Sequence, residues 1–190
     1  VRNNLGRCFN GVLTKGSRKI LYESINDCVA ILTAGKEKDL RAKHAAAYCL
    51  GAIFEAAGDS AVSLSPLACT SLIKQLKPAA NDTGYRSAIF RALGKIVKGI
   101  VAAIEDDIGR TIWKQARNAV SGDKSMLVQA SACWCLEQLT VHTTAYDNSN
   151  DFEKLQTAIW KAMESTSVCA RRAASSCLAN VLVKSYSESP

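Results

Sequence analysis

The sequence predicts an all-α fold, a right-handed α-solenoid of about four and a half helical hairpins. Three observations support this prediction: the composition, a repeat of about 42 residues, and apolar residues at helical spacing inside each repeat. The 190 residues are 48% hydrophobic, so the chain can bury a core, and its three prolines and few aromatics favour helix over a β-sandwich. No apolar run reaches the roughly 20 residues that a membrane helix needs.

One helical motif recurs along the whole chain. The anchor residues of four similar segments, spaced 43, 43 and 42 residues apart, are Leu50, Leu93, Leu136 and Leu178. A fifth copy opens the chain, with Phe9 in the anchor position. Seven residues before the anchors stand Arg2, Lys43, Arg86, Gln129 and Arg171. Apolar residues at i, i+3 and i+4 around each anchor predict an amphipathic helix in every copy.

A second helix lies between successive copies. Apolar residues at helical spacing predict these helices near residues 20–32, 64–76, 108–120 and 152–163, with glycine-rich or polar turns between them. Two helices per period are typical of HEAT repeats, whereas armadillo units usually carry a third. The whole chain, 1–190, is therefore predicted to be one HEAT-repeat array. It divides into a half repeat at 1–16 and full repeats at 17–59, 60–102, 103–144 and 145–186.

The half repeat predicted at 1–16 has no first helix to pack against. Solenoids need polar caps at their ends, yet the apolar face of the first copy lacks a preceding partner helix. We therefore expect the chain to be a segment of a longer solenoid, and we expect that the uncapped end can promote self-association.

Acidic and basic residues stand at the starts of the second helices. Asp39 with Lys43 and Asp82 with Arg86 are four residues apart, where HEAT repeats place an Asp and an Arg. These pairs predict a ladder of contacts between neighbouring repeats. In the later copies Gln129 replaces the base, and Arg171 has no acid four residues before it. The sequence therefore does not decide whether the ladder continues through these copies.

The eight cysteines are better explained by packing in the core than by metal binding, disulfide formation or catalysis. Six of them fall in repeat columns, where a free cysteine acts as a small buried hydrophobic residue. Cys133 and Cys135 are two apart on a helix and cannot face one ion together, and neither histidine has a partner at ligand spacing. Disulfides do not suit a chain without a secretion signal. We therefore predict no catalytic residue, no metal site and no cofactor, and hence no enzyme.

The basic residues are the candidate binding residues. The formal net charge is +7, concentrated in residues 1–19 and 74–98. Arg91, Lys95 and Lys98 follow one helical stripe, and second helices usually line the concave face of a solenoid. A stripe of this kind can bind an acidic partner, although a solvated face that keeps the rod soluble explains it too. The candidate partner-binding residues are Arg86, Arg91, Lys95, Lys98, Lys43 and Trp134.

Two sequence blocks resemble one protein family. Residues 4–8 read N-L-x-R-C, and residues 43–55 read K-x-A-A-x-x-C-L-G-A-x-x-E. Over roughly residues 1–100 the chain resembles the N-terminal region of the large HEAT-repeat accessory proteins of the clathrin adaptor, which comprise the fungal large adaptor-accessory protein and its animal relatives. The resemblance implies a non-enzymatic scaffold for protein–protein contacts in clathrin-adaptor-dependent vesicle traffic between the trans-Golgi network and endosomes.

Partners and location follow from the same resemblance. It implies clathrin adaptor subunits or small adaptor-accessory proteins as partners. It also implies a cytoplasmic protein that reaches trans-Golgi and endosomal membranes only through those partners. The alternative is a basic solenoid that binds nucleic acid or serves nuclear transport. Nucleic acid is the weaker interpretation, because the aromatic residues are sparse and do not alternate with the basic ones.

Overall fold

The computed structural model describes residues 16–35, 39–100, 104–143 and 149–187. The predicted half repeat at 1–16 therefore lies outside the described residues except for its last position. In the described ranges all regular structure is helical, and the helices run in sequence from α2 to α9 with two short 3₁₀ segments, η1 and η2.

The helices pair into hairpins. The first hairpin joins α2 (Arg18–Thr33) to α3 (Leu40–Ala57), and the second joins α4 (Ser65–Gln75) to α5 (Thr83–Gly99). The third and fourth consist of α6 (Asp106–Gly122) with α7 (Met126–His142), and α8 (Ser149–Met163) with α9 (Val168–Ser187). The 3₁₀ segments η1 (Gly58–Leu64) and η2 (Pro78–Asn81) lie on either side of α4.

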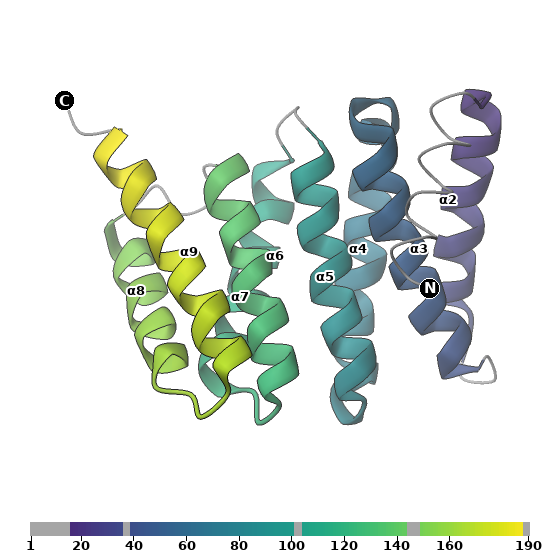
Figure 1. The fold of residues 1–190 in the computed structure, drawn as a ribbon. Coiled ribbons are helices and arrows are strands. Elements are labelled where there is room, and N and C mark those ends of the chain that lie inside the picture. Colours follow the sequence, from purple (N-terminus) through teal and green to yellow (C-terminus); the bar gives the residue numbers. More distant parts are fainter. Residues whose placement is uncertain (1–15, 36–38, 101–103, 144–148, 188–190) are drawn as a thin grey trace.

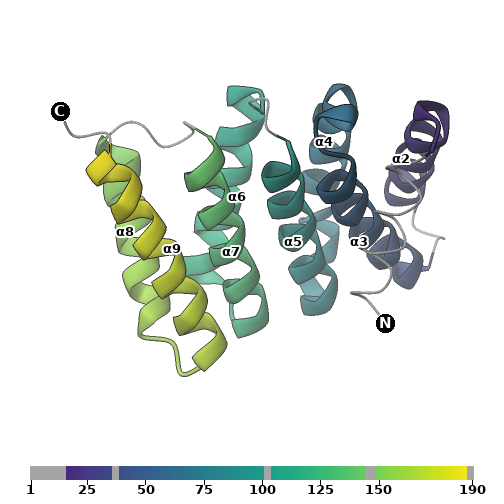
Figure 2. The same ribbon diagram turned by 45° about the horizontal axis from the view of Figure 1, so that its top comes forward.

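The hairpins stack side by side into two layers (Figure 1). Helices α3, α5, α7 and α9 pack against one another in succession and form what we call the second-helix layer. Helices α2, α4, α6 and α8 form the first-helix layer behind it, and Figure 2 shows the same order from another direction. This arrangement confirms the predicted all-α solenoid of helical hairpins.

Aspartates define where two of the second-layer helices begin. The Asp39 side chain accepts a hydrogen bond from the backbone N–H of Arg41 at 3.0 Å, and Asp82 accepts one from Tyr85 at 2.7 Å. A side-chain acceptor at this position satisfies an amide that the helix itself leaves unpaired. The acids that the sequence suggested for the ladder thus cap their own helices.

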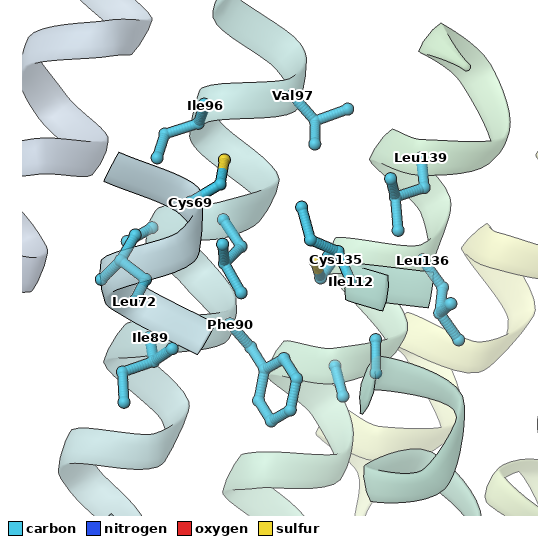
Figure 3. Close-up of a cluster of buried hydrophobic side chains, with 14 of the residues drawn as sticks. Cys69, Leu72, Ile89, Phe90, Ile96, Val97, Ile112, Cys135, Leu136 and Leu139 are labelled. Carbon is cyan, nitrogen blue, oxygen red and sulfur yellow. The ribbon is translucent and has the colours of Figure 1, made fainter. Parts of the chain in front are cut away.

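The core lies between the two layers (Figure 3). The anchors Leu50, Leu93 and Leu136 are fully buried, and Leu178 packs against the same cluster. Four cysteines join this core: Cys69, Cys133, Cys135 and Cys177. Burial raises the pKa of the Cys69 and Cys133 thiols to about 12, so both stay protonated at neutral pH.

Two glycines let the second-layer helices approach closely. A Cβ atom added at Gly51 would lie 2.9 Å from the Cα atom of Ala92 on the next helix. At Gly94 it would lie 2.5 Å from Cζ3 of Trp134. Real Cβ atoms do not tolerate such distances, so the α3–α5 and α5–α7 junctions depend on the missing side chains.

Within the described ranges, no helix is both long enough and apolar enough to span a bilayer.

Candidate interaction surface on the second-helix layer

The predicted basic stripe lies on α5, between the preceding helix α3 and the following helix α7. Arg91 and Lys98 are exposed and Lys95 is half-buried. The repeat places Tyr48 of α3 and Trp134 of α7 at the same position as Arg91, so all three belong to one column of the layer. These three residues therefore lie at matching positions on three neighbouring helices.

Glu55 of α3 binds two of the three bases. Its carboxylate lies 2.7 Å from Nζ of Lys95 and 3.3 Å from Nζ of Lys98. Lys98 remains 51% exposed in this contact. Sequence reasoning selected both lysines but missed Glu55. The available signal was its position, because Glu55 stands one repeat before Lys98 in the same column.

Opposing effects set the pKa of Glu55. Partial burial raises it, but hydrogen bonds and positive charge from Lys95 and Lys98 outweigh burial and hold the pKa below its ordinary value. A carboxylate with a lowered pKa stabilises the fold above the pKa of the unfolded chain, and this contribution is lost as the pH falls through the folded value. The ion pair therefore supports the α3–α5 junction at neutral pH.

Removing the lysine charges should reverse this shift. In the variant K95Q/K98Q we expect the pKa of Glu55 to move above 4.5, its unperturbed value, since burial then acts without the opposing charges. A carboxyl-carbon NMR titration of both proteins measures the change. An identical titration midpoint in the variant would show that the two lysines do not control Glu55.

Arg91 stacks on an aromatic ring of the next repeat. Its guanidinium carbon lies 5.0 Å from the ring centroid of Trp134, which is half-buried over Gly94. This geometry is a cation–π contact, worth about 0.5–1 kcal/mol at an exposed site. The structure thus brings together two of the predicted binding residues, and Trp134 also packs at the α5–α7 junction.

Arg86 forms the predicted contact between repeats, but with an unexpected acid. Its Nη2 atom lies 2.5 Å from Oδ2 of Asp123, in the turn before α7. The Asp123 side chain is only 4% exposed, and its other oxygen accepts the N–H of Ser125 at 2.8 Å. Gln129 donates to the backbone oxygen of Asp123 at 2.8 Å, so the turn is tied to its own helix.

The acid of this junction therefore lies outside the four-residue spacing from which the ladder was predicted. Asp123 stands six residues before Gln129, not four. Lys43, at the position of Arg86 in the first described hairpin, is half-buried on α3. Arg171 at the same position of α9 donates to the backbone oxygens of Ser165 and Thr166, at 2.8 and 3.1 Å.

At the α7–α9 junction, one acid accepts hydrogen bonds from uncharged side chains. Oε1 of Glu137 accepts hydrogen bonds from Ser176 at 3.0 Å and from the Asn180 amide at 2.9 Å. The predicted binding residues all lie on α3, α5 and α7.

Near its C-terminal end, α9 exposes two apolar side chains, Leu182 and Val183. Val97 of α5 and Thr140 of α7 are buried at the repeat position where α9 has Leu182, which is 47% exposed. Its neighbour Val183 is 68% exposed. This face has the position and character of an interface that the other second-layer helices bury.

The described side chains give little support for metal chemistry on this surface. Among the residues that the structure describes, no group of three or more His, Cys, Asp and Glu side chains could hold a metal ion. His44 instead stacks on Tyr48, with ring centroids 5.3 Å apart. The surface combines positive charge, a half-buried tryptophan and partly shielded ion pairs.

Comparisons with known proteins place the chain among helical repeat proteins. No family model matches it. A crystal structure of an engineered protein matches with a TM-score of 0.65 at 18% identity, covering 96% of this chain and 72% of that one. A designed armadillo repeat protein in complex with the peptide (KR)4 matches with a TM-score of 0.66 at 16% identity, covering 94% and 73%. At these identities the likeness shows the α-solenoid fold alone.

Proposed function

We propose that the chain is a non-enzymatic protein-interaction scaffold whose second-helix layer binds an acidic segment of a partner protein. The observation that carries the proposal is the basic surface across α5, where Arg91 and Lys98 are exposed and Arg91 stacks on Trp134. The designed armadillo neighbour is in complex with a basic peptide, (KR)4. Positive charge on the present surface would repel such a ligand and attract an acidic one.

We propose further that the partner belongs to clathrin-adaptor traffic. The support is the sequence resemblance of residues 1–100, and the partners it implies are adaptor subunits or small adaptor-accessory proteins. On this proposal the protein works in the cytoplasm and reaches trans-Golgi and endosomal membranes through those partners. The exposed α9 face supports a related proposal, that the predicted array 1–190 makes one more helical interface, with a second copy or a further repeat.

Binding should respond in opposite directions to two sets of changes. Neutralising the surface in R91Q/K95Q/K98Q should weaken binding of an acidic adaptor-subunit peptide about tenfold, since each base contributes part of the attraction. Glu55→Gln should instead tighten binding, because it releases Lys95 and Lys98 from their internal partner. Fluorescence anisotropy with a labelled peptide measures both.

A matched control removes the same charge elsewhere. Arg110, Lys114 and Lys161 are exposed on α6 and α8 in the first-helix layer, and R110Q/K114Q/K161Q should leave the affinity nearly unchanged. Equal loss of affinity in both triple variants would mean that net charge, rather than this surface, attracts the peptide. Circular dichroism of each variant verifies the fold.

The nucleic-acid alternative has a different signature. A protein that neutralises several phosphates loses affinity steeply as salt rises. Binding of a single-stranded oligonucleotide that exceeds peptide binding, falls steeply with salt and is lost in R91Q/K95Q/K98Q would favour that alternative over the protein scaffold.

A further inference from the structure

Four residues of the second-helix layer form a row whose chemistry changes from one helix to the next. They stand five residues after the leucine anchors, and we call them the mixed row: Glu55 on α3, Lys98 on α5, Val141 on α7 and Val183 on α9. All four are exposed, with Val141 at 47% and Val183 at 68%. In chain order the mixed row therefore presents an acid, a base and two apolar side chains.

The packing of the helices brings the members of this row next to one another. Glu55 and Lys98 form an ion pair of 3.3 Å between α3 and α5. Helix α7 packs on α5, and α9 packs on α7, as extensively as α5 packs on α3 (Figure 1). Nζ of Lys184 donates to the backbone oxygen of Thr143 at 2.8 Å, so the ends of α7 and α9 lie side by side. The register of the repeats therefore extends the row from the base on α5 to the two valines.

We propose that the partner's acidic segment also carries apolar side chains, which cover Val141 and Val183 while its carboxylates contact Lys98 on α5. This inference rests on the proposed function and names the chemistry of the partner more closely. Opposite charge places the acidic part of the segment over α5. The valines are exposed to water, and an apolar side chain that covers them removes apolar surface from water.

The order of charges in the mixed row sets the direction of the segment. Acidic residues that continued from α5 toward α3 would approach the carboxylate of Glu55, which repels them. In the other direction the row continues with valine on α7 and again on α9. The surface therefore fits a segment in which the acidic residues lie on one side and the apolar residues on the other.

The helix packing also predicts the spacing within the segment. Axes of packed helices lie about 8–10 Å apart, and an extended chain advances about 3.3 Å per residue. An extended segment that crosses the layer thus advances by about three residues per helix. We expect its apolar side chains about three and about six residues from the acid that binds Lys98.

Three labelled peptides test the chemistry and the spacing on the full chain by fluorescence anisotropy. The leucine peptide has the core Glu-Glu-Ser-Ser-Leu-Ser-Ser-Leu, and the serine peptide has serine in place of both leucines. The third peptide, Glu-Glu-Leu-Leu-Ser-Ser-Ser-Ser, keeps the composition but not the spacing. We expect the leucine peptide to bind about tenfold more tightly than either of the others.

Protein variants locate the apolar contact. V141S/V183S should bind the leucine peptide about tenfold more weakly than the wild type does, and the serine peptide as tightly. The matched control I20S/L67S changes two side chains of similar exposure on α2 and α4, in the first-helix layer, and should leave both affinities unchanged. Circular dichroism verifies that both variants fold.

Methyl NMR of the wild-type protein supplies a readout that needs no variant. The methyl signals of Val141 and Val183 should shift when the leucine peptide is added and stay in place with the serine peptide. Leucine-dependent shifts that appear only in the methyl groups of Ile20 and Leu67 would place the apolar contact on the other layer and overturn the inference.

Two further results separate this inference from the proposed function. If the leucine and serine peptides bind equally, and both lose affinity in R91Q/K95Q/K98Q, the acidic site stands and the apolar contact is wrong. If neither peptide binds, the binding of an acidic segment fails as well. Equal losses in V141S/V183S and I20S/L67S would likewise contradict the apolar contact, because nonspecific adhesion would explain them.

Discussion

Asp123→Ala is expected to lower the free energy of unfolding of the array by about 2–3 kcal/mol, a larger loss than that expected for Glu55→Gln. The substitution removes a carboxylate that is 4% exposed and leaves Arg86, 23% exposed, without its acid at the α5–α7 junction. It also removes the acceptor for the N–H of Ser125. Chemical denaturation followed by circular dichroism measures the loss.

Two further variants separate the charge from the turn. Asp123→Asn keeps a polar acceptor for Ser125 but removes the charge, so its loss should be smaller than that of Asp123→Ala. Asp107→Ala changes an exposed acid in the first turn of α6 and should cost less than about 1 kcal/mol. If Asp107→Ala and Asp123→Ala were equally destabilising, the Arg86–Asp123 ion pair would contribute no more to the free energy of unfolding than an exposed acid does.

Gly94→Val is expected to lower the free energy of unfolding by about 2–3 kcal/mol. The added Cβ would lie 2.5 Å from the Trp134 ring and 3.3 Å from the Cα atom of Cys135, so helices α5 and α7 would have to separate. Valine is the better helix former, by a few tenths of a kcal/mol, and this gain offsets only part of the clash. The same denaturation experiment measures the effect.

Gly122 provides the matched control. It ends α6, and a Cβ atom added there would meet no atom within 4 Å, so Gly122→Ala should be neutral or slightly stabilising. Trp134→Ala in the Gly94→Val background should recover part of the loss, because the two changes act on one contact. Strictly additive effects in this double variant would contradict the proposed clash.

Much of the fold could be predicted because the same apolar pattern recurs in every repeat. The leucine anchors and the helical spacing around them require only local sequence, and the structure buries those anchors between two layers. The glycines Gly51 and Gly94 lie at close contacts between neighbouring helices. The predicted all-α solenoid follows from these periodic positions, since each helix must bury its apolar face against a neighbour.

The contacts of the candidate surface could not be predicted in the same way. Glu55 and Asp123 bind their bases across repeats, and a helical spacing within one repeat says nothing about the partner on the next. Side-chain reach and helix offset decide such pairs, and both depend on the packed structure.

The differences among the three junctions bear on how similar helices find the right neighbour. The α3–α5 junction uses Glu55 with two lysines, the α5–α7 junction uses a ring over a glycine, and the α7–α9 junction uses Glu137 with neutral donors. If α3 paired with α7 instead, Glu55 would face Gln138 and Val141 in place of Lys95 and Lys98. Such a mispairing would leave a carboxylate without its cations. Unequal junctions therefore act against repeats assembling out of order, which is a common failure of repetitive chains.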